Sequence, residues 1–150
     1  MNEEMMAKFL SEHHIPFKVA SHKPVYNIAE ASEAEGIHPS KVVKNILMKD
    51  EKGFFLIVLC GDTRCDFDKI RDFRRTKRVR MATPEEVKTQ TGVDVGAVNL
   101  FSCPEVIADN GVLKLKEINC HPDDNTKTIY FPVQYLKDVL PHLDVADIAQ

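Results

Sequence analysis

A lysine and an asparagine interrupt an apolar run in the first half of the chain. Lys44 and Asn45 lie within Val42-Val43-Lys44-Asn45-Ile46-Leu47, a run whose composition predicts a strand. Side chains alternate along a strand, so Lys44 is expected on the face of Val42 and Ile46, and Asn45 on the other face. Two interpretations are open. Lys44 is either a half-solvated lysine at a sheet edge or a cleft lysine that binds a phosphate or an ester.

A histidine stands where a later predicted strand ends, in the turn His121-Pro122-Asp123-Asp124-Asn125-Thr126. Loops held by rigid strands often carry binding groups, although a lone histidine in a turn is as a rule a surface or turn-bonded residue. Cys120 and His121 are not expected to pair as nucleophile and base, because adjacent strand residues point to opposite faces. The other cysteines, Cys60, Cys65 and Cys103, lack CxxC spacing, so buried thiols are favoured over a zinc site.

Positive charge gathers in one segment of an acidic chain. Residues 69 to 80 hold seven basic side chains against Asp72, a local charge of +6, which leaves −9 in the rest of a chain of net charge −3. Such a patch suits a phosphate backbone, and a solvated helix end with cations placed for the helix dipole is the alternative. The candidate phosphate-binding residues are Arg74, Arg75, Lys77, Arg78 and Arg80.

A second candidate segment is the glycine-containing run Gly92-Val93-Asp94-Val95-Gly96-Ala97-Val98. Its glycines either permit a tight turn or let a substrate approach backbone donors. The spacing matches neither a P-loop nor a Rossmann turn.

The elements that would position these residues follow from periodicity, caps and turn residues. Asn27 with Glu30 and Thr83 with Glu86 predict capping boxes, and Gly36 and Gly92 predict helix ends. Asp50-Glu51-Lys52-Gly53 predicts a hairpin turn. Helices are expected over residues 3–14, 28–35, 66–75, 84–91 and 133–140, and strands over 17–20, 42–48, 54–60, 79–82, 112–115, 117–120 and 128–131.

This irregular mixture of strands and helices predicts an α+β fold and not a regular parallel βαβ sheet. At 150 residues with 43% apolar content, the chain is expected to form one domain, residues 1–150. The N-terminus does not resemble a secretory signal, and the longest apolar run, 54–60, is too short to span a bilayer. A soluble, cytoplasmic protein with free thiols is expected.

Four segments together resemble the YbaK/prolyl-tRNA-synthetase-associated family, and within it the ProXp-ala (PrdX-like) group. They are HKPVYNIAEA from His22, VVKNILMKDEKG from Val42, TGVDVGAVNLF from Thr91 and CHPDDNTKTIYF from Cys120. The resemblance covers nearly the whole chain and implies a curved, barrel-like mixed sheet flanked by helices. It also implies an enzyme that hydrolyses the ester of mischarged aminoacyl-tRNA.

The resemblance implies roles for particular residues. Lys44, Asn45 and His121 match the catalytic positions, with Lys44 beside the terminal adenosine and the scissile ester. The substrate pocket would be lined by His22, Gly96, Ala97, Val98 and Leu100. Leu100 stands where the family's Gly-x-x-x-Pro loop commonly has proline, which leaves the identity of the aminoacyl group open.

A mechanism follows as a hypothesis. Lys44 holds the adenosine end or the developing anion, backbone donors near Gly96 and Ala97 hold the carbonyl, and the ribose hydroxyl of the tRNA helps to activate water. No cofactor or metal is expected. The expected partner is the acceptor end of mischarged tRNA, with a prolyl-tRNA synthetase as a further candidate, and the chain is expected to be a monomer or a weak homodimer.

The resemblance to the ProXp-ala group implies alanyl-tRNA(Pro) as the substrate, and larger aminoacyl groups would be excluded chiefly by their size. The alternatives are a cysteinyl-tRNA(Pro) deacylase of the YbaK type and a non-catalytic module that binds tRNA or a synthetase. A hydrolase of another class lacks a nucleophile or metal motif.

Overall fold

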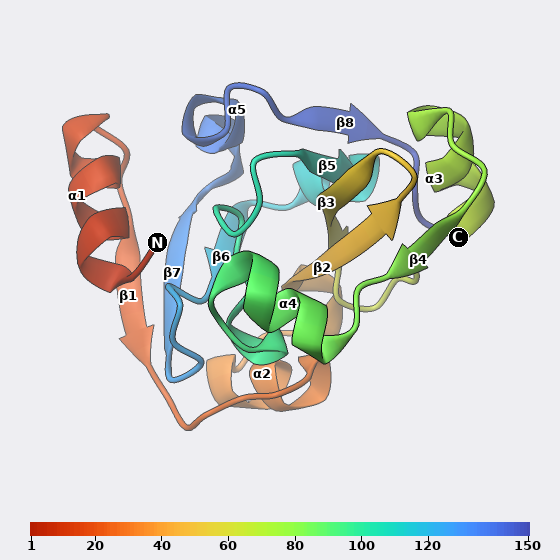
Figure 1. Ribbon diagram of the computed structural model, residues 1–150. Coiled ribbons are helices and arrows are strands. Elements are labelled where there is room, and N and C mark those ends of the chain that lie inside the picture. The colour runs from red at the N-terminus through yellow and green to blue at the C-terminus, as the bar shows by residue number, and fades with distance from the viewer.

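Two β-sheets form the middle of the molecule (Figure 1). The computed structural model describes residues 1–150. One sheet has five strands in the order β4-β2-β3-β5-β8, and the other has three in the order β1-β7-β6. The strands are β1 Lys18–Ser21, β2 Val43–Asp50, β3 Gly53–Cys60, β4 Val79–Met81, β5 Val106–Asp109, β6 Glu117–Cys120, β7 Lys127–Pro132 and β8 Asp144–Ala146. The expected α+β class is confirmed, and its strands are divided between these two sheets.

The helices begin and end where local signals place them. The Asn27 side chain caps α2 by accepting from the Glu30 N–H, and Gly36 ends the helix with a positive φ of 68°. The Glu30 carboxylate accepts from the Tyr26 N–H, one residue earlier than a capping box requires. The predicted capping box of Thr83 is present in α4. The helices are α1 Glu3–Glu12, α2 Ile28–Glu35, α3 Phe67–Arg74, α4 Pro84–Thr91 and α5 Leu136–Val139.

The β2–β3 hairpin is the predicted one, with Val43 opposite Cys60 and Asp50 opposite Gly53. Gly53 adopts φ 122°, a conformation that disfavours any residue with a Cβ. Beyond β3 the strand pairing changes from antiparallel to parallel, because β5 pairs in parallel with β3, and β8 with β5. The hairpin therefore forms the antiparallel half of a mixed sheet.

The C-terminal half contains three differences from the expectation. Residues 112–115 were expected as a strand, but Asn110–Lys114 is a 3₁₀ helix that follows β5, with the Asp109 carboxylate accepting from Gly111 N–H. The expected helix 133–140 is a 3₁₀ turn, Val133–Tyr135, followed by the short α5. Strands β5 and β8 were not expected, because pairing between distant parallel segments leaves little local signal.

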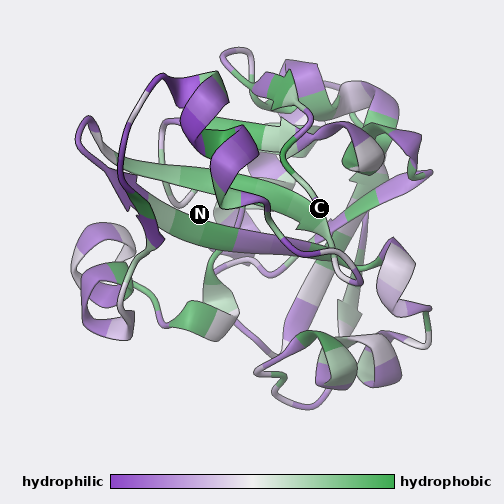
Figure 2. Cartoon of the chain, turned by 90° about the vertical axis from the view of Figure 1, so that its right-hand side faces the viewer, coloured by the Kyte–Doolittle hydropathy of each residue, from purple (hydrophilic) through white to green (hydrophobic).

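The main core lies between the two sheets. Buried side chains of both sheets, among them Leu56 and Phe131, pack with Met6 and Leu10 of α1. A second cluster lies on the other face of the five-stranded sheet, where Phe55 packs near Ile70 of α3. Figure 2 shows the hydrophobic residues on the central strands and hydrophilic residues over the outer faces of the helices. None of the helices has the length and apolar character needed to cross a membrane.

One side chain connects the two sheets. Asn119 of β6 is 5% exposed, and its Oδ1 accepts from the Val43 N–H at 2.9 Å while its Nδ2 donates to the Lys41 carbonyl at 2.8 Å. The first residue of β2 is thus fixed to the three-stranded sheet. We call these two bonds the Asn119 link.

Candidate functional site

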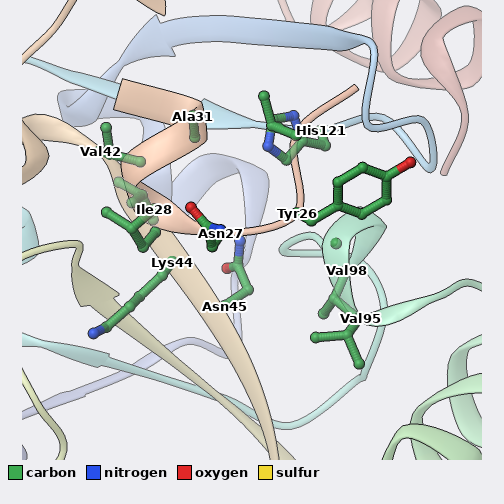
Figure 3. Close-up of a pocket in the computed structure, with 13 residues that line it drawn as sticks. Tyr26, Asn27, Ile28, Ala31, Val42, Lys44, Asn45, Val95, Val98 and His121 are labelled. Atoms are coloured by element: carbon green, nitrogen blue, oxygen red, sulfur yellow. The ribbon is translucent and has the colours of Figure 1, made fainter. Parts of the chain in front are cut away.

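A cleft of about 170 Å³ opens at the start of β2, beside the Asn119 link. It combines residues from four separate parts of the chain: the segment before α2 and α2 itself, the start of β2, the loop after α4, and the end of β6 (Figure 3). Apolar side chains make up most of its wall. The polar side chains that reach it are Tyr26, Asn27, Lys44, Asn45 and His121.

Lys44 lines the cleft, but its ammonium points away from His121 (Figure 3). The Nζ donates to the Thr63 carbonyl and lies 3.5 Å from the Gly61 carbonyl oxygen. Burial lowers the pKa of this ammonium below its ordinary value, and the nearby Cys65 and Asp62 oppose that shift. Lys44 is therefore a partly desolvated cation held by the loop after β3.

Asn45 lies on the opposite face of β2 from Lys44, as the alternation of the strand predicts. Its neighbours on that face, Val43 and Leu47, belong to the main core. The Asn45 Oδ1 is buried and has no hydrogen-bond partner in the protein. A buried amide oxygen without a partner costs about 1–3 kcal/mol, so this group is suited to bind a ligand that supplies a donor.

His121 is fixed by a directional chain of hydrogen bonds. Its Nδ1 lies 2.8 Å from the Lys127 carbonyl, so Nδ1 carries the proton and Nε2 is left as an acceptor. Thr128 Oγ1 lies 3.4 Å from the same Nδ1 and 2.7 Å from His22 Nε2. His22 Nδ1 in turn donates to the Lys23 carbonyl at 2.7 Å. Nε2 is therefore the ring nitrogen of His121 that remains to accept a proton.

His22 contacts the site through His121. The two imidazole rings pack edge to face with centroids 5.7 Å apart, but His22 is absent from the cleft wall, where it was expected. Its Nε2 accepts from the Thr128 hydroxyl, because its Nδ1–H donates to the Lys23 carbonyl. His22 thus supports the orientation of His121.

The glycine-containing loop approaches the cleft through Gly96 and Val98. A Cβ on Gly96 would lie 3.2 Å from the Val25 carbonyl oxygen, so the close approach of these two segments favours glycine. The Ala97 N–H donates to the Asp94 carbonyl at 2.9 Å, and Ala97 lines the neighbouring cavity instead of the cleft. The Ala97 N–H is therefore already paired within the loop, and backbone donors near Gly96 stay a prediction.

Leu100 also lies elsewhere than expected. Its side chain is completely buried in the main core and does not line the cleft. A leucine at this position fills space between the sheets, so its effect on the substrate is indirect, through the path of the loop that carries Val98.

The basic segment is at the other end of β2. Strand β4 pairs with Met48–Asp50, five residues from Lys44, which corresponds to roughly 17 Å along a strand. Arg75, Lys77 and Arg78 are exposed and form no ion pair. Arg80 is exposed but makes two hydrogen bonds to the Glu86 carboxylate, at 2.7 and 3.0 Å.

Arg74 does not belong to this exposed group. Its side chain is only 8% exposed, forms an ion pair with Asp50 and lies 3.2 Å from Glu105. The guanidinium also lies 3.8 Å above the Phe55 ring. Desolvation by burial lowers the pKa of Arg74, but the hydrogen bonds and charges of Asp50 and Glu105 together raise it above its ordinary value. The expected phosphate contact is corrected to a structural role, because this cation is already neutralised.

The four cysteines are free and buried. Burial raises the pKa of the Cys120 thiol to about 12, and its Sγ lies 4.0 Å from the Met6 sulfur in the core. A thiol of this kind is protonated at neutral pH, so it cannot act as the nucleophile beside His121.

Sequence reasoning overlooked three residues at or near the site. Asn119 has a usable signal, since it is an amide between two apolar residues in a strand. Tyr26 lies in a segment that carried the resemblance, but no pattern indicates that an aromatic ring before a helix stays exposed. Thr128 carries no signal, because its role depends on two histidines distant in sequence.

Comparison with known proteins gives a consistent picture. The family model described as the aminoacyl-tRNA editing domain matches residues 22–139. A "Proline--tRNA ligase" of Thermotoga sp. (strain RQ2) is 35% identical over 102 residues, which are 67% of this chain and 18% of that ligase. The chain thus spans less than a fifth of the first curated relatives it matches.

Two further relatives are similar over most of their length. The "Prolyl-tRNA editing protein ProX" of Acetoanaerobium sticklandii is 24% identical over 140 residues, 87% of this chain and 85% of that protein. A solved structure, described as that of a proposed trans-editing enzyme for prolyl tRNA synthetase, has a TM-score of 0.82 at 24% identity and covers 98% of this chain and 96% of its own. That structural likeness confirms the fold.

Proposed function

The chain belongs to the aminoacyl-tRNA editing domain family, whose members hydrolyse aminoacyl-tRNA esters, and on that premise we propose that it removes alanine from mischarged tRNA(Pro) in trans. The observation that carries the proposal is the orphan Oδ1 of Asn45, placed in an apolar cleft between the Lys44 stem and His121. A polar group without a partner at this place is accounted for by a substrate that supplies the missing hydrogen bond.

The chemistry requires no covalent intermediate. Water attacks the carbonyl carbon of the ester, the bond to the ribose 3′ oxygen breaks, and the products are the free amino acid and the tRNA 3′ hydroxyl. His121 Nε2 is positioned to accept a proton, directly or through the ribose hydroxyl. The Asn45 amide orients the groups around the carbonyl. Gly96, as part of a loop held against Val25, fixes one wall of the cleft.

Lys44 is assigned to the ribose-phosphate side of the terminal adenosine, and not to its base or to the developing anion. Its ammonium points away from His121 and is held by carbonyl groups of the loop after β3. This arrangement supports an anchoring role at the far end of the cleft. The exposed cations Arg75, Lys77 and Arg78 are assigned to the helical part of the tRNA, at a distance from the ester.

The preference for alanine rests on the size of the cleft and on its apolar wall. A cavity of about 170 Å³ walled by Val25, Ile28, Ala31 and Val42 favours a small aliphatic group, and larger groups are excluded sterically. Cysteine is the alternative, since its side chain adds only one sulfur. We also place the reaction in the cytoplasm, and a prolyl-tRNA synthetase is the proposed partner.

The test is a deacylation panel. The purified chain is incubated with alanyl-, cysteinyl- and prolyl-tRNA(Pro), and the loss of each ester is followed over time. Alanyl-tRNA(Pro) is expected to be hydrolysed fastest, and Lys44→Ala to reduce its rate by roughly a hundredfold or more, because the ester is no longer held in position. Lys8→Ala, on the exposed face of α1, is the control. Full activity of Lys44→Ala would contradict the mechanism, and tRNA binding without turnover of any substrate would favour the non-catalytic module.

A further inference from the structure

Tyr26 is an aromatic side chain that the fold leaves in solvent at the edge of the cleft. Tyr26 is 70% exposed, the largest exposed fraction among the exposed large hydrophobic residues of the chain. Figure 3 places the ring beside His121 and Val98, on the side of the cleft away from the Lys44 ammonium. A side chain this exposed buries little apolar area and adds little to the stability of the fold. Packing in the core therefore does not account for an aromatic residue here.

The backbone of Tyr26 is held in place although its ring is exposed. The Tyr26 N–H donates to the Glu30 carboxylate at 2.8 Å. The neighbouring Val25 N–H donates to the Asn125 carbonyl, and the Val25 carbonyl accepts from the Asn125 side-chain amide. A Cβ on Gly96 would lie 3.7 Å from the Tyr26 Cα, so the loop before β5 packs directly against this residue. The ring is thus a positioned surface and not part of a loose loop.

Tyr26 separates the cleft from a second, more polar cavity. It lines both, and the second cavity is walled by Asp94, Asp123, Asp124 and Asn125 together with Lys88. The carboxylates outnumber the single lysine, which disfavours a phosphate at this place. Carboxylate and amide oxygens suit a neutral group that carries amino hydrogens.

We propose that Tyr26 is the stacking platform for the terminal adenine of the tRNA 3′ end. Single-stranded nucleotides are bound by stacking of their bases on aromatic side chains, and adenine offers both a π-face and an exocyclic amino group. This inference rests on the proposed function, since it places the adenine of the substrate whose ester lies in the cleft. Tyr26 then contributes to binding and not to the chemical step.

The binding test uses the absence of tryptophan from the chain. Tyr26→Trp introduces one fluorophore at the platform, and Phe73→Trp introduces one on α3, at a ring that is 43% exposed and away from the cleft. The probes are the trinucleotide CCA and the same trinucleotide without its terminal base. CCA is expected to quench the Tyr26→Trp protein saturably and to leave the Phe73→Trp protein unchanged. Equal quenching of both proteins, or by both probes, would overturn the proposal.

The kinetic test separates stacking from other roles. Tyr26→Ala is expected to raise KM for alanyl-tRNA(Pro) by about tenfold or more with little change in kcat, while Tyr26→Phe stays close to the unmodified chain. A loss in Tyr26→Phe as large as in Tyr26→Ala, or no change in either, would refute a stacking role. If the unmodified chain hydrolyses no aminoacyl-tRNA, the proposed function fails, and the fluorescence result decides on the platform independently.

Discussion

The buried Oδ1 of Asn45 lacks a partner within the protein, and this separates its role in binding from any role in stability. A side chain that makes no compensating hydrogen bond does not stabilise the fold through its amide. The Asn45 amide is explained by a complex in which the substrate supplies the hydrogen-bond donor for its Oδ1.

Asn45→Ala is therefore expected to lower kcat/KM for alanyl-tRNA(Pro) by about tenfold or more without lowering the melting temperature by the amount typical of a lost hydrogen bond. Deacylation rates and thermal denaturation of the same protein provide the measurement. Asn110→Ala, at an exposed residue remote from the cleft, is the control for the substitution itself. A clear loss of stability with unchanged turnover would assign Asn45 to the fold instead.

Val98 offers a test of substrate size. It is 5% exposed and lines the cleft, so Val98→Ala is expected to widen the cleft by two methyl groups. Discrimination by a single methylene is worth roughly 10- to 200-fold. The rate ratio of alanyl- to cysteinyl-tRNA(Pro) should thus fall in the variant. The panel of charged tRNAs measures this ratio directly, and an unchanged ratio would show that Val98 does not contact the aminoacyl group.

Among the elements, those with local signals were predictable from the sequence. Asn27, Gly36 and Thr83 fix the ends of α2 and α4 through side-chain caps and a positive φ, and these depend only on near neighbours. β5 was missed because its partners in the sheet, β3 and β8, lie far away in sequence. Whether a long side chain is buried also depends on distant partners, which is why Arg74 was misplaced.

Helix α4 provides a prediction for pH. Hydrogen bonds from Arg80, followed by the Thr83 N–H, lower the pKa of Glu86 to about 2 from 4.5. A carboxyl whose folded-state pKa is lowered contributes stability above its unfolded value, and that contribution is lost as the pH falls from about 4.5 toward 2. Glu86→Gln should therefore have a lower melting temperature than the unmodified chain at pH 7, and the difference should vanish near pH 2.

The control for this comparison is Glu85→Gln on the same helix turn. Glu85 is exposed and forms no ion pair, so its replacement should leave the melting temperature nearly unchanged at every pH. A difference between Glu86→Gln and the unmodified chain that persists below pH 2 would mean that the amide disturbs the helix by another route.

For the whole molecule, the site depends on the fit between two sheets. Lys44 and Asn45 belong to the five-stranded sheet, while His121 and Thr128 belong to the end of β6 and to β7. The candidate catalytic residues could be named from the sequence through the family resemblance. The distance between these residues could not be predicted from the sequence. It is set by the Asn119 link, a contact between residues 76 positions apart.

Asn119→Ala is expected to destabilise the protein by about 2–4 kcal/mol, because one buried and one partly buried hydrogen bond are lost and the Val43 N–H is left without a partner. Urea denaturation measures this change. Asn110→Ala again serves as the exposed control. A destabilisation equal to that of the control would mean that packing alone holds the sheets together.

The Asn119 link also makes one amide proton a reporter of movement between the sheets. The Val43 N–H donates to a side chain of the opposite sheet and not to the backbone ladder of its own hairpin. Its exchange with deuterium therefore requires only that the sheets separate, whereas the hairpin amides exchange when the hairpin itself opens. Exchange at this single proton, compared with and without bound tRNA, would measure how far the substrate closes the molecule around itself.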